Sequence, residues 1–205
     1  MKTLSLLLIL LFISCNNRTS DSEKRAKEEN RERLDSQARL DEGPTSEPVP
    51  LSRSDADFLV EAASGGNLEV QLGHMVENKS TSEQVRAFGS MIIKDHEEGG
   101  EKLKRLAIAK NIVLPDSISV AQQKRKDKLQ KENSDFDRAY MNLMVDDHKK
   151  DIREFQKAAK DASDSEVKAF AADHLTMLYK HLDSAEKILK RMGPERIPVS
   201  APPYK

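Results

Sequence analysis

Met91-Ile92-Ile93-Lys94-Asp95-His96 and Leu143-Met144-Val145-Asp146-Asp147-His148 are two copies of one short motif, and they decide the fold. Each copy runs from apolar residues through a charged residue to Asp-His, and each lies midway along a strongly helical pattern. The two histidines are 52 residues apart (148 − 96 = 52), about one helix, one connection and half of the next helix. An internal repeat of this period predicts two related helical hairpins with the same polar residues at the same depth.

The sequence around the repeat predicts four long amphipathic helices. Their apolar residues recur at intervals of three and four, so each helix has one face to bury. We expect the third helix to begin near Ser134-Asp135 and the fourth to end at Met192, before Gly193-Pro194. The other three starts resemble capping boxes, in which a serine is followed three residues later by an acidic residue: Ser54 with Asp57, Ser80 with Glu83, and Ser163 with Glu166.

The predicted fold is all-α, an antiparallel four-helix bundle over residues 51–192. Only the link between the second and third helices is long, and residues 119–131 in it predict a short surface helix. Aromatic residues make up 4% of the chain and charged residues 34%, a profile typical of helical proteins and not of β-sandwiches. The formal net charge of −1 supplies no overall field to attract nucleic acid, so no nucleic-acid partner is expected.

The first residues have the pattern of a targeting segment. Residues 1–14 predict a lipoprotein signal peptide, in which Lys2 precedes an apolar run too short to span a bilayer. Cys15, the only cysteine, directly follows this run and resembles the lipidated cysteine of a bacterial lipobox, although Phe12 departs from the usual Leu, Val or Ile. The residue after the cysteine is Asn16, and not the Asp that retains many such lipoproteins on the inner membrane. We therefore expect a lipid-anchored envelope protein, in the outer membrane facing the periplasm.

Two segments outside the predicted bundle have compositions typical of chains without fixed structure. Residues 15–50 are crowded with charges of both signs and end in a Pro-rich piece, so we interpret them as a tether. Transient helix is expected between Ser22 and Leu40, with no apolar stripe to hold it against the bundle. Residues 193–205 form a Pro-rich tail.

Six polar residues fall on or beside the predicted inner faces and come from all four helices. A buried carboxylate or imidazole has to be hydrogen-bonded, paired or bound to a metal ion. Carboxylates and imidazoles together suit iron, manganese or zinc, so the first hypothesis is an interior metal site. The six candidate ligands are Glu69, Asp95, His96, Asp147, His148 and His181.

A second hypothesis needs no metal. If the hairpins are related by a pseudo-twofold axis, His96 faces Asp147 and His148 faces Asp95, and these reciprocal pairs clasp the helices in register. The adjacency of Asp and His departs from the Glu-x-x-His spacing of di-iron bundles, because neighbouring residues lie about 100° apart around a helix. An unassigned small-molecule site is the third alternative. His174 is interpreted as a satisfied histidine outside the site, and the basic run 124–126 as a solvated face.

Residues 51–190 resemble the bacterial domain of unknown function 4142 family. The resemblance implies a ferritin-like helical fold and a secreted or lipid-anchored location, and it implies no agreed activity. The matching pieces are Asp57-Phe58, Gly66-Asn67-Leu68-Glu69-Val70, the run 91–96, Leu114-Pro115, Phe136-Asp137-Arg138-Ala139-Tyr140, Met144-Val145-Asp146-Asp147-His148 and His181-Leu182.

The sequence contains no nucleophile–base pair and no phosphate-binding loop, which favours a non-catalytic role over an enzyme. The expected function is therefore that of a lipid-anchored envelope protein with a binding or structural role. The lipid on Cys15 is expected to attach the protein to the membrane, and the sequence does not identify a protein partner. The alternative function is metal binding by the interior residues.

Overall fold

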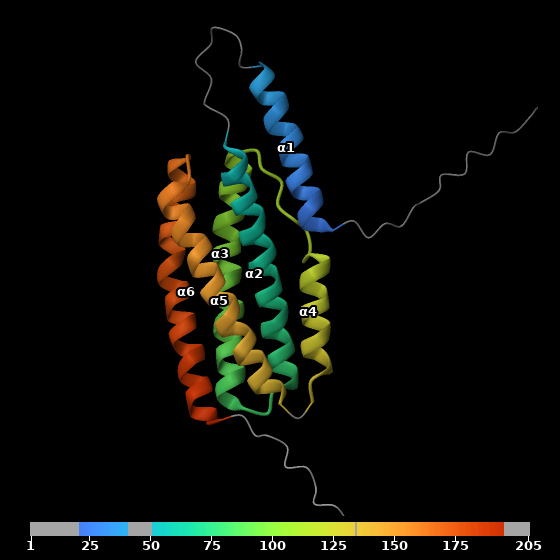
Figure 1. Ribbon diagram of the computed structural model, residues 1–205, viewed down its shortest axis with the longest axis vertical. Helices are drawn as coiled ribbons and strands as arrows, with labels where there is room; N and C mark the ends of the chain where they lie inside the picture. Colours follow the sequence, from blue (N-terminus) through green and yellow to red (C-terminus); the bar gives the residue numbers. More distant parts are fainter. Residues whose placement is uncertain (1–20, 41–50, 134, 195–205) are drawn as a thin grey trace, which may run out of the picture.

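The computed structural model describes residues 21–40, 51–133 and 135–194, and every regular element in these ranges is an α-helix. The prediction of an all-α protein is confirmed. Figure 1 shows four long helices side by side, with two further helices along one flank. The six helices are α1 (Ser22–Leu40), α2 (Arg53–Lys79), α3 (Glu83–Ala109), α4 (Val120–Lys131), α5 (Phe136–Asp161) and α6 (Ser165–Met192).

The long helices form two hairpins, α2 with α3 and α5 with α6, and the hairpins meet mainly where α3 packs against α6. Helix α4 lies in the long connection between α3 and α5, as predicted, and contacts both α2 and α5. The first hairpin closes tightly because two glycines face each other. A Cβ added at Gly73 would lie 3.0 Å from the carbonyl oxygen of Gly89 and 2.6 Å from Cγ1 of Ile93, so only glycine permits this approach.

Two apolar clusters fill the interior. One includes Leu72, Phe88 and Met144, and the other includes Leu59, Phe155 and Phe170. Buried polar side chains lie at the level between them, since His148 on α5 stands between Met144 of the first cluster and Ile152 of the second. The repeated motif thus contributes a polar layer in the middle of an otherwise apolar core.

The tether interpretation is wrong for residues 22–40. These residues form α1, which packs on α2 and on the connection after α3. Its buried residues recur every fourth position and are mostly small or polar: Ser22, Ala26, Asn30 and Leu34. The Asn30 amide donates to the Val113 carbonyl (2.8 Å) and accepts from the Val113 N–H (2.7 Å). Side-chain hydrogen bonds replace the missing apolar stripe.

Three predicted helix starts are displaced by one or two residues. Ser52, not Ser54, caps α2, and Ser82, not Ser80, caps α3. Ser80 instead ends α2 by donating its backbone N–H to the Val76 carbonyl. Asp164, not Ser163, caps α6, because its carboxylate accepts from the N–H groups of Glu166 and Val167.

The predicted signal peptide, Cys15 and the tail beyond residue 194 lie outside the described residues, so those predictions stand as they were. Within the described ranges, no helix combines the length and the apolar character needed to cross a bilayer.

Candidate metal centre

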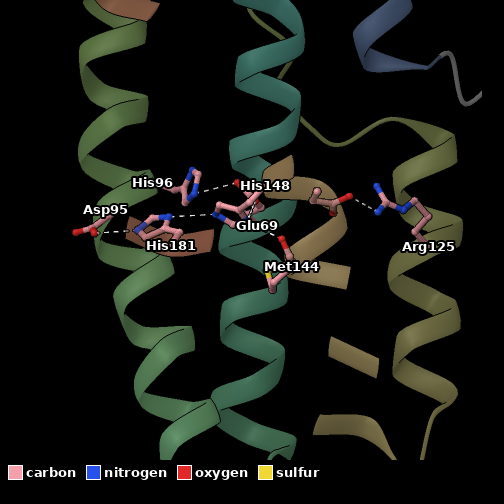
Figure 2. Close-up of polar contacts among 8 residues, drawn as sticks. Glu69, Asp95, His96, Arg125, Met144, His148 and His181 are labelled. Carbon is pink, nitrogen blue, oxygen red and sulfur yellow. Dashed lines mark hydrogen bonds and ion pairs between the residues drawn. The ribbon is translucent and has the colours of Figure 1, made fainter. Parts of the chain in front are cut away.

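Three histidines from three helices meet in the polar layer. His96 lies on α3, His148 on α5 and His181 on α6, and each offers a ring nitrogen such that the three nitrogens lie within 4.8 Å of one another. Figure 2 shows the rings turned toward each other, with Glu69 of α2 beside them. His148 and His181 are fully buried, and the side chain of His96 is 8% exposed. The cluster is therefore a dry group of imidazoles.

A chain of contacts crosses the bundle through two of these rings. Nδ1 of His148 lies 2.8 Å from the Met144 carbonyl oxygen, one turn earlier on α5. Its Nε2 lies 3.2 Å from Nδ1 of His181, and Nε2 of His181 lies 3.0 Å from Oδ2 of Asp95. Both ends of this chain are oxygen acceptors, so both outer nitrogens have to carry protons.

That requirement determines what lies between the rings. A neutral imidazole carries one N–H, and the carbonyl or carboxylate at each end already uses it. The two inner nitrogens, 3.2 Å apart, would then face each other with lone pairs. A cation between them resolves this conflict: either an extra proton, which charges a buried ring, or a metal ion bound by both nitrogens. The other tautomer of His181 places its proton between the rings and leaves its Nε2 lone pair against the Asp95 carboxylate.

Glu69 and His96 are not satisfied by the surrounding protein. Oε2 of Glu69 lies 3.0 Å from Nε2 of His96, and its Oε1 lies 3.4 Å from Nδ1 of His148. Neither contact has hydrogen-bond geometry, and among the described residues Glu69 Oε1 and His96 Nε2 are buried without any hydrogen-bond partner. Unsatisfied buried groups of this kind are costly, and a bound ion is one recognised explanation for them.

The local electrostatics follow from burial and from the carboxylates. Burial alone would raise the pKa of Glu69, but the imidazoles of His96 and His148 hold it at about 2. Burial alone would lower the pKa of His96, and the Glu69 carboxylate outweighs it and raises that pKa above its usual value. Burial and the neighbouring imidazoles lower the pKa of His181 to about 4. The site thus favours an ionised glutamate and an unprotonated His181, the form that binds metals, whereas a metal ion has to displace a proton from His96.

Asp147 does not join this cluster. Its carboxylate pairs instead with Arg125 of α4. The predicted pair of His96 with Asp147 is therefore wrong. Burial of the Asp147 carboxyl raises its pKa despite the guanidinium beside it. Arg125, placed by the sequence in a solvated basic run, instead tethers the short helix α4 to the bundle.

Asp95 is at the rim of the cluster. It accepts from His181, not from His148, so the second predicted pair is also wrong. Its other contact is with Nζ of Lys180, 3.3 Å away. His174 lies outside the cluster, as predicted, and its Nδ1–H donates to the Phe170 carbonyl (2.8 Å).

The sequence prediction missed Asp151. This carboxyl lies on α5 three residues after His148, on nearly the same helix face, and burial together with the negative charges of Glu69 and Asp147 raises its pKa to about 8. The spacing His148-x-x-Asp151 was a usable signal, because residues three apart on a helix are neighbours. The Arg125–Asp147 pair had no such signal, since it depends on where α4 docks.

The comparisons with known proteins agree with this architecture. The chain matches the family model described as Domain of unknown function (DUF4142) over residues 40–188. None of the curated proteins matches it significantly.

Two solved structures share the fold. A DUF305 fragment from Deinococcus radiodurans aligns with a TM-score of 0.62 at 15% identity, over 69% of this chain and 99% of the fragment. A putative spore coat protein from Bacillus halodurans aligns with a TM-score of 0.58 at 12% identity, over 72% of this chain and 95% of that protein. At these identities the likeness shows the helical fold alone.

Proposed function

Since this chain belongs to the DUF4142 family, whose description carries no activity, we propose a function from the site itself: the protein binds one divalent transition-metal ion. The ligands are the imidazoles of His96, His148 and His181, with the Glu69 carboxylate beside them as a fourth donor or as the balancing charge. Three imidazoles and one carboxylate are a donor set suited to zinc, iron or manganese.

The separation of His148 Nε2 from His181 Nδ1 is the observation that carries this proposal. Two nitrogens bound tetrahedrally to zinc at 2.0–2.1 Å lie about 3.3 Å from each other. The two nitrogens here are 3.2 Å apart with their protons committed elsewhere. A metal ion fits this spacing and also supplies a partner for the unsatisfied Glu69 and His96 atoms.

A purely structural clasp is the competing function, and one feature of the site opposes it. A polar network stabilises a core when every member is satisfied, and a partly satisfied network costs more than an apolar core. The chain from Met144 to Asp95 has the form of a clasp, but Glu69 Oε1 and His96 Nε2 remain unpartnered among the described residues. Metal binding accounts for both atoms.

Its cellular setting is part of the same proposal and rests on sequence pattern alone. A lipid on Cys15 would anchor the bundle in the bacterial envelope, in the outer membrane facing the periplasm, where the site could bind metal ions outside the cytoplasm. Metabolic labelling with a fatty acid, with Cys15→Ala as the control, tests the anchor independently of the metal.

Elemental analysis of the full chain purified without chelator, followed by zinc titration calorimetry, tests metal binding. We expect about one ion per chain, and loss of binding in the His96→Ala, His148→Ala double variant with helicity retained by circular dichroism. His74→Ala is the matched control, because His74 is exposed on α2 and contacts Glu77 outside the cluster. The proposal fails if the double variant binds as tightly as the control.

A further inference from the structure

Two hollows in the molecule reach the histidine cluster from different sides. The larger, which we call the acidic cavity, has a volume of about 1310 Å³ and is lined by Glu69 and His96 at its inner end. The smaller, the second cavity, has a volume of about 450 Å³ and reaches Asp95. His148 and His181 line neither of them, so an ion entering from solvent meets Glu69 and His96 or Asp95 first.

Glycines keep the acidic cavity open on its way to His96. A Cβ added at Gly65 or at Gly100 would meet no atom within 4 Å, and one added at Gly66 would lie 3.7 Å from Nδ1 of His96. All three glycines line the cavity. Side chains at these positions would fill the space that leads to the cluster, so their absence leaves a path to it.

The lining of the acidic cavity holds eight acidic side chains and two lysines, Lys104 and Lys150. Of the acidic side chains, Glu61 and Asp116 pair with Lys27 and Arg25 of α1. Glu97, Glu101 and Glu154 have no ion pair among the described residues, whereas Asp151, whose pKa is raised to about 8, carries little charge near neutral pH. Acidic side chains therefore outnumber basic ones around this cavity.

The second cavity is closer to balance, with three acidic side chains and two lysines in its lining. Asp95 lies 3.3 Å from Lys180, and Glu98 lies 2.9 Å from Lys102, with both lysines in the lining. Of its acidic side chains, only Asp173 has no ion pair among the described residues. A cation that approaches this opening meets paired charges, including an ammonium group directly beside Asp95.

We infer that the acidic cavity is the access route by which hydrated divalent cations reach the three-histidine site, and that the second cavity is not. This inference rests on the proposed function. Clefts lined by one sign of charge focus the field and raise the association rate of oppositely charged solutes by roughly 10–10³-fold. Glu69 and His96 are buried at the inner end of this cavity, 3.0 Å apart and with one atom each that lacks a hydrogen-bond partner among the described residues, and they stand where the ion exchanges its water for protein ligands.

Stopped-flow uptake of Co²⁺ by the metal-free full chain, followed by its visible absorption, tests the route. The variant Glu97→Gln, Glu101→Gln, Glu154→Gln removes three cavity charges. The matched control Glu98→Gln, Asp146→Asn, Asp173→Asn removes three charges from the second cavity and the exposed surface. We expect the cavity variant to bind at least tenfold more slowly with a weaker dependence on salt, and the control to retain the wild-type rate.

A second variant separates a path from a general field effect. Gly65→Leu places a side chain in the cavity, at a position where an added Cβ would meet no atom within 4 Å. A blocked path slows uptake and release by the same factor, so the dissociation constant stays unchanged while both rates fall at least fivefold.

The outcomes distinguish this inference from the function it rests on. Equal uptake rates in the cavity variant and its control, or unchanged rates in Gly65→Leu, overturn the route while metal binding stands. Loss of Co²⁺ binding in the wild type itself overturns both. Faster uptake in the control than in the cavity variant, together with matched slowing of both rates in Gly65→Leu, supports the route.

Discussion

At the scale of single residues, the glycines of α2 divide into two kinds that the sequence does not distinguish. Gly73→Ala should destabilise the protein by about 1–3 kcal/mol, because its Cβ would press on Ile93 and on the Gly89 carbonyl. Gly65→Ala should stabilise it by up to about 1 kcal/mol, since alanine favours the helix and nothing lies within 4 Å of the new atom. Urea unfolding of both variants measures these two changes in the free energy of unfolding. Equal changes would contradict the prediction.

His174 gives a pH prediction away from the proposed ligands. Burial lowers its pKa below the usual value, with Lys102 and His96 adding to the effect and the Phe170 carbonyl and Asp173 opposing it. Because the unfolded chain takes up this proton more readily, His174 contributes stability that is present above about pH 6.5 and is lost as the pH falls through its folded pKa. The metal-free wild type should therefore lose more stability between pH 7 and 5 than His174→Phe.

Phenylalanine keeps the packing of this ring, whose centroid lies 4.0 Å from that of Phe170. Urea midpoints at the two pH values, measured with chelator present, provide the comparison. His174→Gln is a second variant without a titrating ring and should show the same reduced pH dependence. If the urea midpoint of the wild type changes with pH as little as the midpoints of both variants, His174 does not titrate in this range.

The sequence predicted which residues are polar and interior more successfully than it predicted their partners. His96, His148 and His181 are buried as the helical spacing indicated, and Glu69, which falls beside the apolar stripe of its helix, is buried as well. Partners depend on the rotation of each helix: with His148 turned inward, Asp147 is directed about 100° away, toward Arg125. The symmetric pairing assumed from the repeat failed because Asp147 pairs with Arg125 and not with His96, and Asp95 contacts His181 and not His148.

At the scale of elements, α1 is an addition held mainly by polar contacts. The family match begins at residue 40, so α1 precedes it. A chain lacking residues 1–40 should keep α2–α6 folded and lose stability relative to a chain lacking only residues 1–20. Circular dichroism and urea unfolding of the two chains test this. Loss of the cooperative transition would show instead that α1 belongs to the core.

Asn30→Ala tests how much of the stability contributed by α1 depends on one side chain. The change breaks two hydrogen bonds to Val113 and should cost about 1–3 kcal/mol if α1 stays docked. If α1 detaches, the backbone of Val113 hydrogen-bonds to water. The loss in the free energy of unfolding therefore cannot exceed the loss caused by removing α1 altogether. Urea unfolding of Asn30→Ala beside the two truncated chains measures this, and a larger loss would mean that Asn30 acts beyond its docking role.

The elements themselves were largely predictable, because long helices carry strong periodic signals. All four long helices and the short helix near residues 119–131 were expected, and only their first residues were misplaced. Capping residues such as Ser52 and Asp164 are hard to choose among neighbouring serines and aspartates. Helix α1 was misjudged because its buried stripe consists of Ser22, Ala26, Asn30 and Leu34, which a search for large apolar residues overlooks.

At the scale of the whole molecule, the proposed ligands couple the two hairpins. Glu69 and His96 belong to the first hairpin, and His148 and His181 belong to the second. An ion held by both therefore opposes their separation, which is the step that exposes the core. At a free metal concentration 100 times the dissociation constant, the added stability would be about 2.7 kcal/mol.

Amide hydrogen exchange with and without zinc tests this coupling. Protection should rise together in the central turns of α2, α3, α5 and α6, because an ion bound by residues of all four helices opposes the separation of the two hairpins. Protection in α1 should stay unchanged, since α1 lies on α2 and supplies none of the proposed ligands. Chelator should reverse the effect. A rise confined to α5 and α6, where His148 and His181 touch directly, would mean that the ion is held by one hairpin and that His96 and Glu69 do not take part.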